Sequence, residues 1–251
     1  MRSCFAAAVL FFVTLNAFAG WFGFGGTSWQ EEVLLHDGSK LVLERSVTRG
    51  GPHEIGQRGS YTKETITFKH PVTGKMITWE DNATPDLRTS SFLPMALDVY
   101  PDGVYLVLRP MGCLSYNKWG RPNPPYVVFR FVENTWNRVD LSVLPAETKA
   151  PNMISSSPDT EVERIGKRFI DSETVKRITN EYRQSENKTI LRAAMEAPAG
   201  RCGEMVHDGK GGWVGIGWFR DQPNLQACVL FCKRKDFSDE DCPCKRFFKE
   251  Q

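Results

Sequence analysis

Four pairs of apolar runs, each pair separated by a turn sequence, limit what this chain can fold into more than any other feature. The turns contain Asp37-Gly38, Pro71–Gly74, Pro101–Gly103 and Glu133-Asn134. β-Branched and aromatic residues in the runs suit pleated strands, and the turn residues suit tight reversals. The runs are Val33–Leu35, Leu41–Leu43, Thr65–Phe68, Met76–Trp79, Ala96–Tyr100, Val104–Leu108, Tyr126–Phe131 and Trp136–Val139. This pattern predicts four antiparallel hairpins across residues 29–145.

The hairpin pattern predicts a β-rich α+β protein and leaves the arrangement of its strands open. Eight antiparallel strands are compatible with a sandwich, a barrel-like sheet or two propeller-like blades. Two blades cannot close a propeller, which needs about four or more. The hairpins share turn chemistry but no fixed period, so the sequence predicts no solenoid.

The composition changes near Leu144-Pro145, at the end of the predicted β region. Prolines and a triple serine between residues 146 and 158 are typical of a linker or long loop. Two helices are predicted next, the second capped by Ser172, and a third short helix is predicted over residues 190–195. Apolar residues at helical spacing are Val162, Ile165 and Phe169, then Val175, Ile178 and Tyr182.

The last part of the chain is predicted to return to strands, at Trp213–Phe219 and Ala227–Phe231. Residues 146–251 are therefore predicted to form an α+β region that contains most of the cysteines, either separate from the preceding β region or in one domain with it.

The N-terminus has the pattern of a secretory signal peptide. One basic residue, Arg2, precedes an apolar run of about ten residues, and the small-x-small sequence Ala17-Phe18-Ala19 follows. We predict cleavage after Ala19, so that residues 1–19 are the signal peptide. Removal of 19 of the 251 residues leaves 232, and the loss of Arg2 leaves 31 basic residues against 30 acidic ones.

An uncleaved membrane anchor is the alternative for this segment, because no charge occurs between Arg2 and Glu31. Asn16 and four glycines in residues 20–26 weaken a spanning helix, and residues 20–28 are predicted to be a flexible segment rich in glycine and aromatic residues. Both alternatives export the rest of the chain. They predict a periplasmic or secreted protein, with a membrane contact only if the anchor stays uncleaved.

Export changes the meaning of the cysteines. Cys4 lies in the signal peptide, and an even number in an exported chain predicts disulfides. The six that remain are Cys113, Cys202, Cys228, Cys232, Cys242 and Cys244. Six cysteines allow 15 pairings. A hairpin-like C-terminal fold would join Cys228 and Cys232 to Cys244 and Cys242, which leaves Cys113 for Cys202.

Zinc is the alternative for the four C-terminal cysteines. Their spacing, C-x3-C-x9-C-x-C, departs from the C-x2-C pairs that are usual at zinc sites. In an exported chain this departure favours disulfides, so the sequence predicts no metal site and no cofactor.

Charge and motifs exclude several functions. A formal net charge of +2 without a basic stripe does not predict nucleic-acid binding. The phosphate-binding loop, the nucleophile elbow and the H-E-x-x-H zinc motif are all absent from the sequence. Disulfide formation would also leave no thiolate for catalysis. The sequence thus predicts no catalytic residue, although acids distant in sequence can still converge on a glycosidase-like pair.

Two long loops are candidates for ligand binding. The first contains Arg49 and His53 beside flexible glycines, and the second contains Tyr116, Trp119 and Arg121 after Cys113. Flat rings stack on sugars, cations pair with anions, and long loops often carry function. The competing interpretation is that Trp119 packs against the core and fixes its loop.

Part of the chain resembles exported bacterial proteins of unknown function. The similarity lies in Glu31–Gly38, Glu44-Arg45, Gly50-Gly51 and Glu64–Phe68, and further in Pro125–Phe129 and Trp136. It covers mainly residues 29–145 and implies an envelope location and a β-rich fold. It implies no activity and no catalytic residue.

The sequence therefore favours an exported bacterial envelope protein that binds a partner protein or a glycan without catalysis, and it leaves enzymatic activity open. One alternative is an envelope hydrolase that uses paired carboxylates. Another is a purely structural or partner-protein module, which an exposed apolar patch or an open sheet edge would favour.

Overall fold

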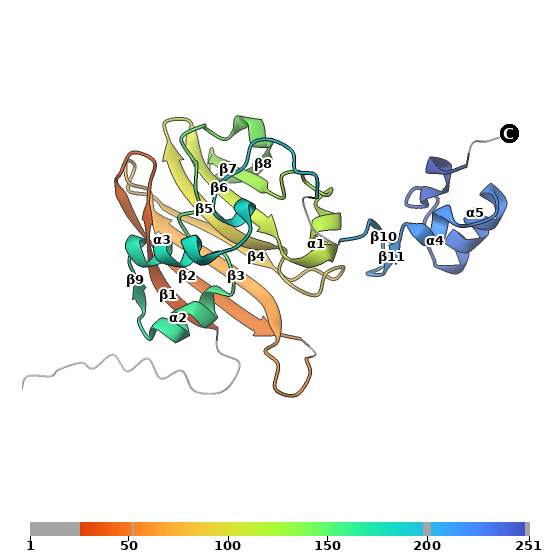
Figure 1. Cartoon of the computed structure of the whole chain (residues 1–251), viewed down its shortest axis with the longest axis horizontal. Helices are drawn as coiled ribbons and strands as arrows, with labels where there is room; N and C mark the ends of the chain where they lie inside the picture. The colour runs from red at the N-terminus through yellow and green to blue at the C-terminus, as the bar shows by residue number, and fades with distance from the viewer. Residues whose placement is uncertain (1–25, 52, 198–201, 249–251) are drawn as a thin grey trace, which may run out of the picture.

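The computed structural model describes residues 26–51, 53–197 and 202–248 (Figure 1). The predicted signal peptide, residues 1–19, lies outside the described residues. Thr27 and Ser28 were predicted to be flexible, but they begin the first strand because they pair with Val47 and Ser46.

All four predicted hairpins are present. Strands β1 (Thr27–Leu34), β2 (Lys40–Gly50), β3 (Ser60–Lys69) and β4 (Met76–Asn82) form one antiparallel meander. Strands β5 (Phe92–Tyr100), β6 (Gly103–Pro110), β7 (Val127–Val132) and β8 (Thr135–Val139) form a second. A short strand, β9 (Phe169–Ile170), adds to the first sheet parallel to β1.

The two sheets pack on one hydrophobic core (Figure 1). In β4 buried and exposed residues alternate strictly, so that Ile77 and Trp79 point to the core. The second sheet contributes Phe92, Leu97 and Leu106 to the same cluster. Burial of each of these side chains stabilises the folded state by about 1.5–3 kcal/mol, before the entropy lost by ordering the side chain is subtracted. Two separate sheets with a shared core are a sandwich-like arrangement of the predicted strands.

Two helices close one end of this core. Helix α2 (Pro158–Ile165) and helix α3 (Ser172–Glu181) both contact β1, and Val162, Val175 and Ile178 pack in a second cluster with Trp29. The predicted helical face extended to Phe169, but Gly166 ends α2 in a left-handed conformation. Phe169 therefore lies in β9.

Two further details of the helical region differ from the sequence predictions. Asp171, not Ser172, caps α3 by accepting a hydrogen bond from the Thr174 amide. Ser172 instead donates its hydroxyl to Glu32. Residues 190–195 contain no helix, and Ile190 is buried in a third cluster of apolar residues, which includes Met95, Tyr105 and Val128. Short 3₁₀ turns occur at Leu141–Val143 and Ser185–Asn187.

The C-terminal part is mainly helical, which corrects the prediction of a disulfide-linked β segment. Strands β10 (Met205–His207) and β11 (Trp213–Gly215) form a two-stranded ribbon beside helix α1 (Gly112–Lys118). Helix α4 (Gly217–Arg220), helix α5 (Leu225–Arg234) and a 3₁₀ turn at Pro243–Arg246 follow. Figure 1 shows them beyond the ribbon, away from the sheets. Asn224 caps α5, so the apolar run at residues 227–231 continues as a helix.

The predicted disulfides are all present. Cys113 is bonded to Cys202 across 89 residues of sequence, and this bond joins α1 to the start of the C-terminal part. Cys228 is bonded to Cys244, and Cys232 is bonded to Cys242. Three disulfides are typical of an oxidising, extracytoplasmic environment. Within the described ranges, the structure contains no helix of the length and apolarity that a bilayer span requires.

Candidate functional site

The first predicted ligand-binding loop is mainly occupied by internal contacts. Arg49 donates two hydrogen bonds to Asp159, at 2.6 and 2.9 Å, and its guanidinium lies 3.9 Å from the centre of the Tyr61 ring. Burial alone would raise the pKa of Asp159, but hydrogen bonds from Arg49 and Tyr61 hold it below its usual value. His53 is exposed, and its Nδ1 contacts the Gly51 carbonyl at 2.9 Å.

The second predicted loop also serves packing. Tyr116 is buried in α1, and Trp119 packs against Phe92 with ring centres 4.6 Å apart. Arg121 lies 5.0 Å from the centre of the Tyr116 ring and donates to the backbone carbonyl of Cys202 at 3.1 Å. These contacts attach α1 to the segment that follows the disulfide.

The five predicted ligand residues therefore fall into two groups on separate elements. Arg49 and His53 belong to the end of β2 and the loop after it, whereas Tyr116, Trp119 and Arg121 belong to α1 and the turn that follows. In Figure 1 the β2–β3 loop and α1 lie apart. The structure does not bring the two groups together into one site.

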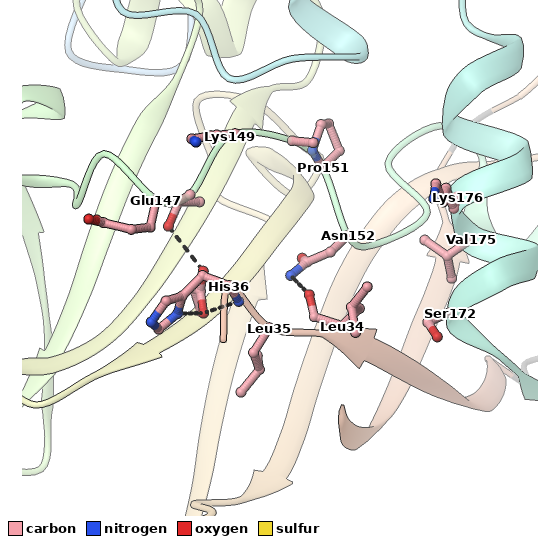
Figure 2. A pocket seen from close by; sticks show the side chains of 13 residues that line it. Leu34, Leu35, His36, Glu147, Lys149, Pro151, Asn152, Ser172, Val175 and Lys176 are labelled. Carbon is pink, nitrogen blue, oxygen red and sulfur yellow. Dashed lines mark hydrogen bonds and ion pairs between the residues drawn. The ribbon is translucent and has the colours of Figure 1, made fainter. Parts of the chain in front are cut away.

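A different cavity offers a better candidate site (Figure 2). It has a volume of about 260 Å³ and lies between the β1–β2 turn, the segment of residues 147–152 and helix α3. Apolar side chains form much of its wall, among them Leu35, Pro151 and Val175. This volume lies just below the range of about 300–1,000 Å³ that is typical of ligand pockets, so the cavity suits a small ligand or one end of a larger one.

A buried carboxylate anchors one end of this cavity. Asp98 is 2% exposed and lies 2.8 Å from His36 Nδ1. Because a carboxylate only accepts hydrogen bonds, Nδ1 is the donor. The same Asp98 oxygen accepts from the Val99 amide at 3.0 Å, and the other oxygen accepts from the hydroxyls of Tyr100 and Thr148, both at 3.2 Å. The His36 ring also stacks on Tyr100, with centres 4.1 Å apart.

These contacts fix His36 at the cavity without using its second nitrogen. Nε2 has no hydrogen-bond partner among the residues that the structure describes. An imidazole held by Asp98 in one orientation can donate to, or accept from, a bound molecule. Burial raises the pKa of Tyr100 to about 12, so Tyr100 stays neutral and donates its hydroxyl.

Two lysines lie at the cavity rim, in addition to the acids Asp98 and Glu147 that also line the cavity. Lys149 and Lys176 line opposite sides, and neither side chain has a partner within the described ranges. Glu147 also lines the cavity, but Figure 2 shows its carboxylate extending away from Asn152 and Val175. An anionic group at the rim would therefore meet two unpaired cations.

Asn152 fixes the segment that forms the upper wall. Its side-chain amide donates to the carbonyls of Leu34 at 3.0 Å and Leu97 at 2.8 Å, and its oxygen accepts from the Leu97 amide at 2.9 Å. One side chain thus ties the wall to both sheets. These hydrogen bonds to β1 and β5 fix the position of the wall segment.

A buried ionic cluster anchors the same segment further along. Arg45, Glu31 and Glu64 have fully buried side chains, and Arg45 lies 2.6 Å from Glu64 and 3.2 Å from Glu31. Arg45 also donates to the Ile154 carbonyl, and Glu31 accepts from the Ile154 amide. Burial raises the pKa of Glu64 to about 7 despite the opposing effect of Arg45.

Sequence reasoning missed both His36 and Asp98 as site residues. His36 directly precedes the predicted Asp37-Gly38 turn, and Asp98 lies within the predicted apolar run Ala96–Tyr100. An acid inside an apolar strand was the available signal, because a buried carboxylate needs several hydrogen-bond donors. Which residues supply those donors depends on contacts 50 and 62 positions away in sequence.

The C-terminal cysteines are the described residues with the spacing of a metal site. The sulfurs of Cys232, Cys242 and Cys244 lie within 4.8 Å of one another. In this structure all three are in disulfides: Cys232 is bonded to Cys242, and Cys244 is bonded to Cys228.

Comparisons with protein-family models, curated proteins and solved structures found no match to this chain. The resemblance to exported bacterial proteins over residues 29–145 therefore stays a prediction.

Proposed function

We propose that this chain is an exported, non-catalytic bacterial envelope protein whose cavity beside His36 binds a small carboxylate-bearing ligand, such as the end of an anionic glycan. The observation that carries the proposal is the pairing of an apolar-walled cavity with Lys149 and Lys176, which have no partners of their own within the described ranges. Each lysine supplies a point charge, and His36 supplies a directed hydrogen bond.

Envelope location is part of this proposal. The signal-peptide pattern before Ala19 supports export to the periplasm or the cell surface, and the three disulfides agree with it. The partner would be a glycan or protein of the envelope. The intact mass of the exported chain tests this part, since cleavage after Ala19 leaves 232 residues.

A hydrolase with paired carboxylates has less support. Such an enzyme needs two acids that are free to exchange protons with a substrate. Both oxygens of Asp98 accept hydrogen bonds from protein groups, and the Glu147 carboxylate extends away from the opposite wall. The arrangement therefore favours a fixed binding site.

Titration calorimetry and ligand-observed NMR would test the site with two probe pairs. Glucuronate and benzoate carry a carboxylate, whereas glucose and benzamide are their neutral counterparts. We expect an acid to bind more tightly than its neutral counterpart. Failure of both acids to bind, or equal binding of acid and neutral probes, would refute the proposed ligand class.

Matched charge variants locate the binding. K149Q/K176Q removes both rim charges, whereas K75Q/K188Q removes two exposed lysines that do not line the cavity. Loss of two exposed ion pairs corresponds to about 1.4 kcal/mol, or about a tenfold loss of affinity. Equal affinity in the two variants would place the ligand elsewhere.

A further inference from the structure

The four C-terminal cysteines occupy a single compact site. Cys228 and Cys232 lie one turn apart on the same face of α5, and Cys242 and Cys244 flank Pro243 at the following 3₁₀ turn. The Cys244 sulfur is bonded to Cys228 and lies 3.4 Å from the Cys242 sulfur and 3.5 Å from the Cys232 sulfur. One sulfur thus contacts all three others.

These distances are close to those of a tetrahedral metal centre. Zinc–thiolate bonds of about 2.3 Å place the sulfurs of a four-cysteine site about 3.8 Å apart. The contacts of the Cys244 sulfur with the Cys232 and Cys242 sulfurs need to open by only a few tenths of an ångström. The Cys228 sulfur lies outside the group of three sulfurs that fall within 4.8 Å of one another, so it has to move closer to the others when the site forms. Sulfurs that are disulfide-bonded, at about 2.05 Å, need to separate by less than 2 Å after reduction. Rotation of side chains can supply movements of this size without rebuilding the fold.

The surroundings also suit a closed metal site. Cys228, Cys232 and Cys244 are almost fully buried, and Phe219, Phe237 and other aromatic side chains pack around them.

We propose that reduction converts this disulfide pair into a zinc site with Cys228, Cys232, Cys242 and Cys244 as its four ligands. Two equivalents of a dithiol reductant transfer four electrons and four protons, which break two S–S bonds, form four thiols and leave two oxidised dithiols. Zinc then displaces the four thiol protons and forms four Zn–S bonds. Disulfide exchange with two equivalents of an oxidised dithiol reverses the conversion and releases the zinc.

This site is independent of the proposed ligand cavity, which contains no cysteine. The proposal gives the C-terminal helices a role as a redox-controlled zinc binder, in which the same four side chains stabilise the fold in either state. Structural zinc sites contribute folding free energy directly, so zinc would replace the stabilisation that the two disulfides provide.

The test uses the purified chain reduced with a phosphine under anaerobic conditions. Native mass spectrometry counts bound zinc, and cobalt(II) substitution reports tetrahedral thiolate ligation through its absorption spectrum. We expect one zinc per reduced chain, with a dissociation constant below ~1 µM, and none per oxidised chain. Absence of zinc from the reduced chain, or equal zinc binding by the oxidised chain, would overturn the proposal.

Two variants identify the ligands. C113S/C202S retains all four proposed ligands and should bind zinc like the wild type, whereas C242S/C244S should lose at least about a hundredfold in affinity. Loss of zinc from C113S/C202S, or retention by C242S/C244S, would also overturn the proposal. The comparison of reduced and oxidised wild type needs no variant, so a variant that fails to fold does not prevent a decision.

Discussion

Replacement of Arg45 by methionine should strongly destabilise the protein, because it leaves two carboxylates buried without a cation. The Arg45, Glu31 and Glu64 side chains are all 0% exposed, so water cannot screen the remaining charges. Breaking a buried ion pair in this way costs about 3–5 kcal/mol. Methionine keeps much of the side-chain volume of arginine. The loss of unfolding free energy in R45M therefore reports the lost charge and hydrogen bonds more than lost packing. The Ile154 carbonyl also loses its donor.

Urea unfolding without reductant, followed by tryptophan fluorescence, would measure this loss. Trp29 donates to Glu31 at 2.9 Å and lies near Arg45, so the cluster contributes to the combined emission of the seven tryptophans that follows unfolding. A loss of 3–5 kcal/mol corresponds to a fall of about 10 °C in Tm for a domain of this size. The triple variant E31Q/R45M/E64Q removes all three charges and should recover much of the stability.

The pH dependence gives an independent check on the R45M variant. Without Arg45, nothing opposes the effect of burial on Glu64, so the pKa of this carboxyl rises further and its protonated form is favoured in the folded state. The stabilising contribution of the protonated form is fully present below the unfolded pKa, near 4.5, and is lost as the pH rises through the folded value. The R45M deficit should therefore be smaller at pH 5 than at pH 7.5. A deficit below about 1 kcal/mol at pH 7.5, or one independent of pH, would refute this reasoning.

Three further predictions concern stability. Burial raises the pKa of Glu64 to about 7, so wild-type stability should fall between about pH 4.5 and 7, and E64Q should remove roughly 3 kcal/mol of that fall in urea titrations across this range. C113S/C202S should lose about 2–4 kcal/mol in non-reducing calorimetry, because the bond closes 89 residues; no change in Tm would contradict this. The pKa of Asp159 is lowered, so D159N should cost roughly 1.5–3 kcal/mol at neutral pH, with a deficit that shrinks below pH 4; a constant deficit would exclude the ion pair as its cause.

The hairpins were predictable because each is encoded locally. Asp37-Gly38 and Pro101–Gly103 supply turns between runs of residues that favour strands, and neither feature depends on distant contacts. The C-terminal run Ala227–Phe231 misled the prediction for the opposite reason. Short apolar runs suit a buried strand or a helix equally well. The Asn224 cap and the packing around Phe219 and Cys228 select the helix.

The ligand-site prediction identified residues capable of binding but could not see their partners. Arg49 is paired with Asp159, 110 positions away, and Arg121 with the carbonyl of Cys202. A cation next to an aromatic ring has the same sequence signature in a ligand site and in an internal contact. Only the fold shows that Lys149 and Lys176, which have no special sequence pattern, flank a cavity.

The sequence by itself determined the four hairpins and the β-rich α+β class, because turn chemistry restricts the chain locally. The cysteine pairs were predicted correctly, but from a hairpin-like C-terminal fold in place of which the structure has helix α5 and a 3₁₀ turn. The tertiary structure alone decided that the hairpins form two sheets over one core, that the C-terminal cysteines lie on a helix, and that Asp98 holds His36 beside a cavity. These features depend on contacts between residues tens of positions apart. Such contacts form only when burial of the core brings those residues together, so no local pattern records them.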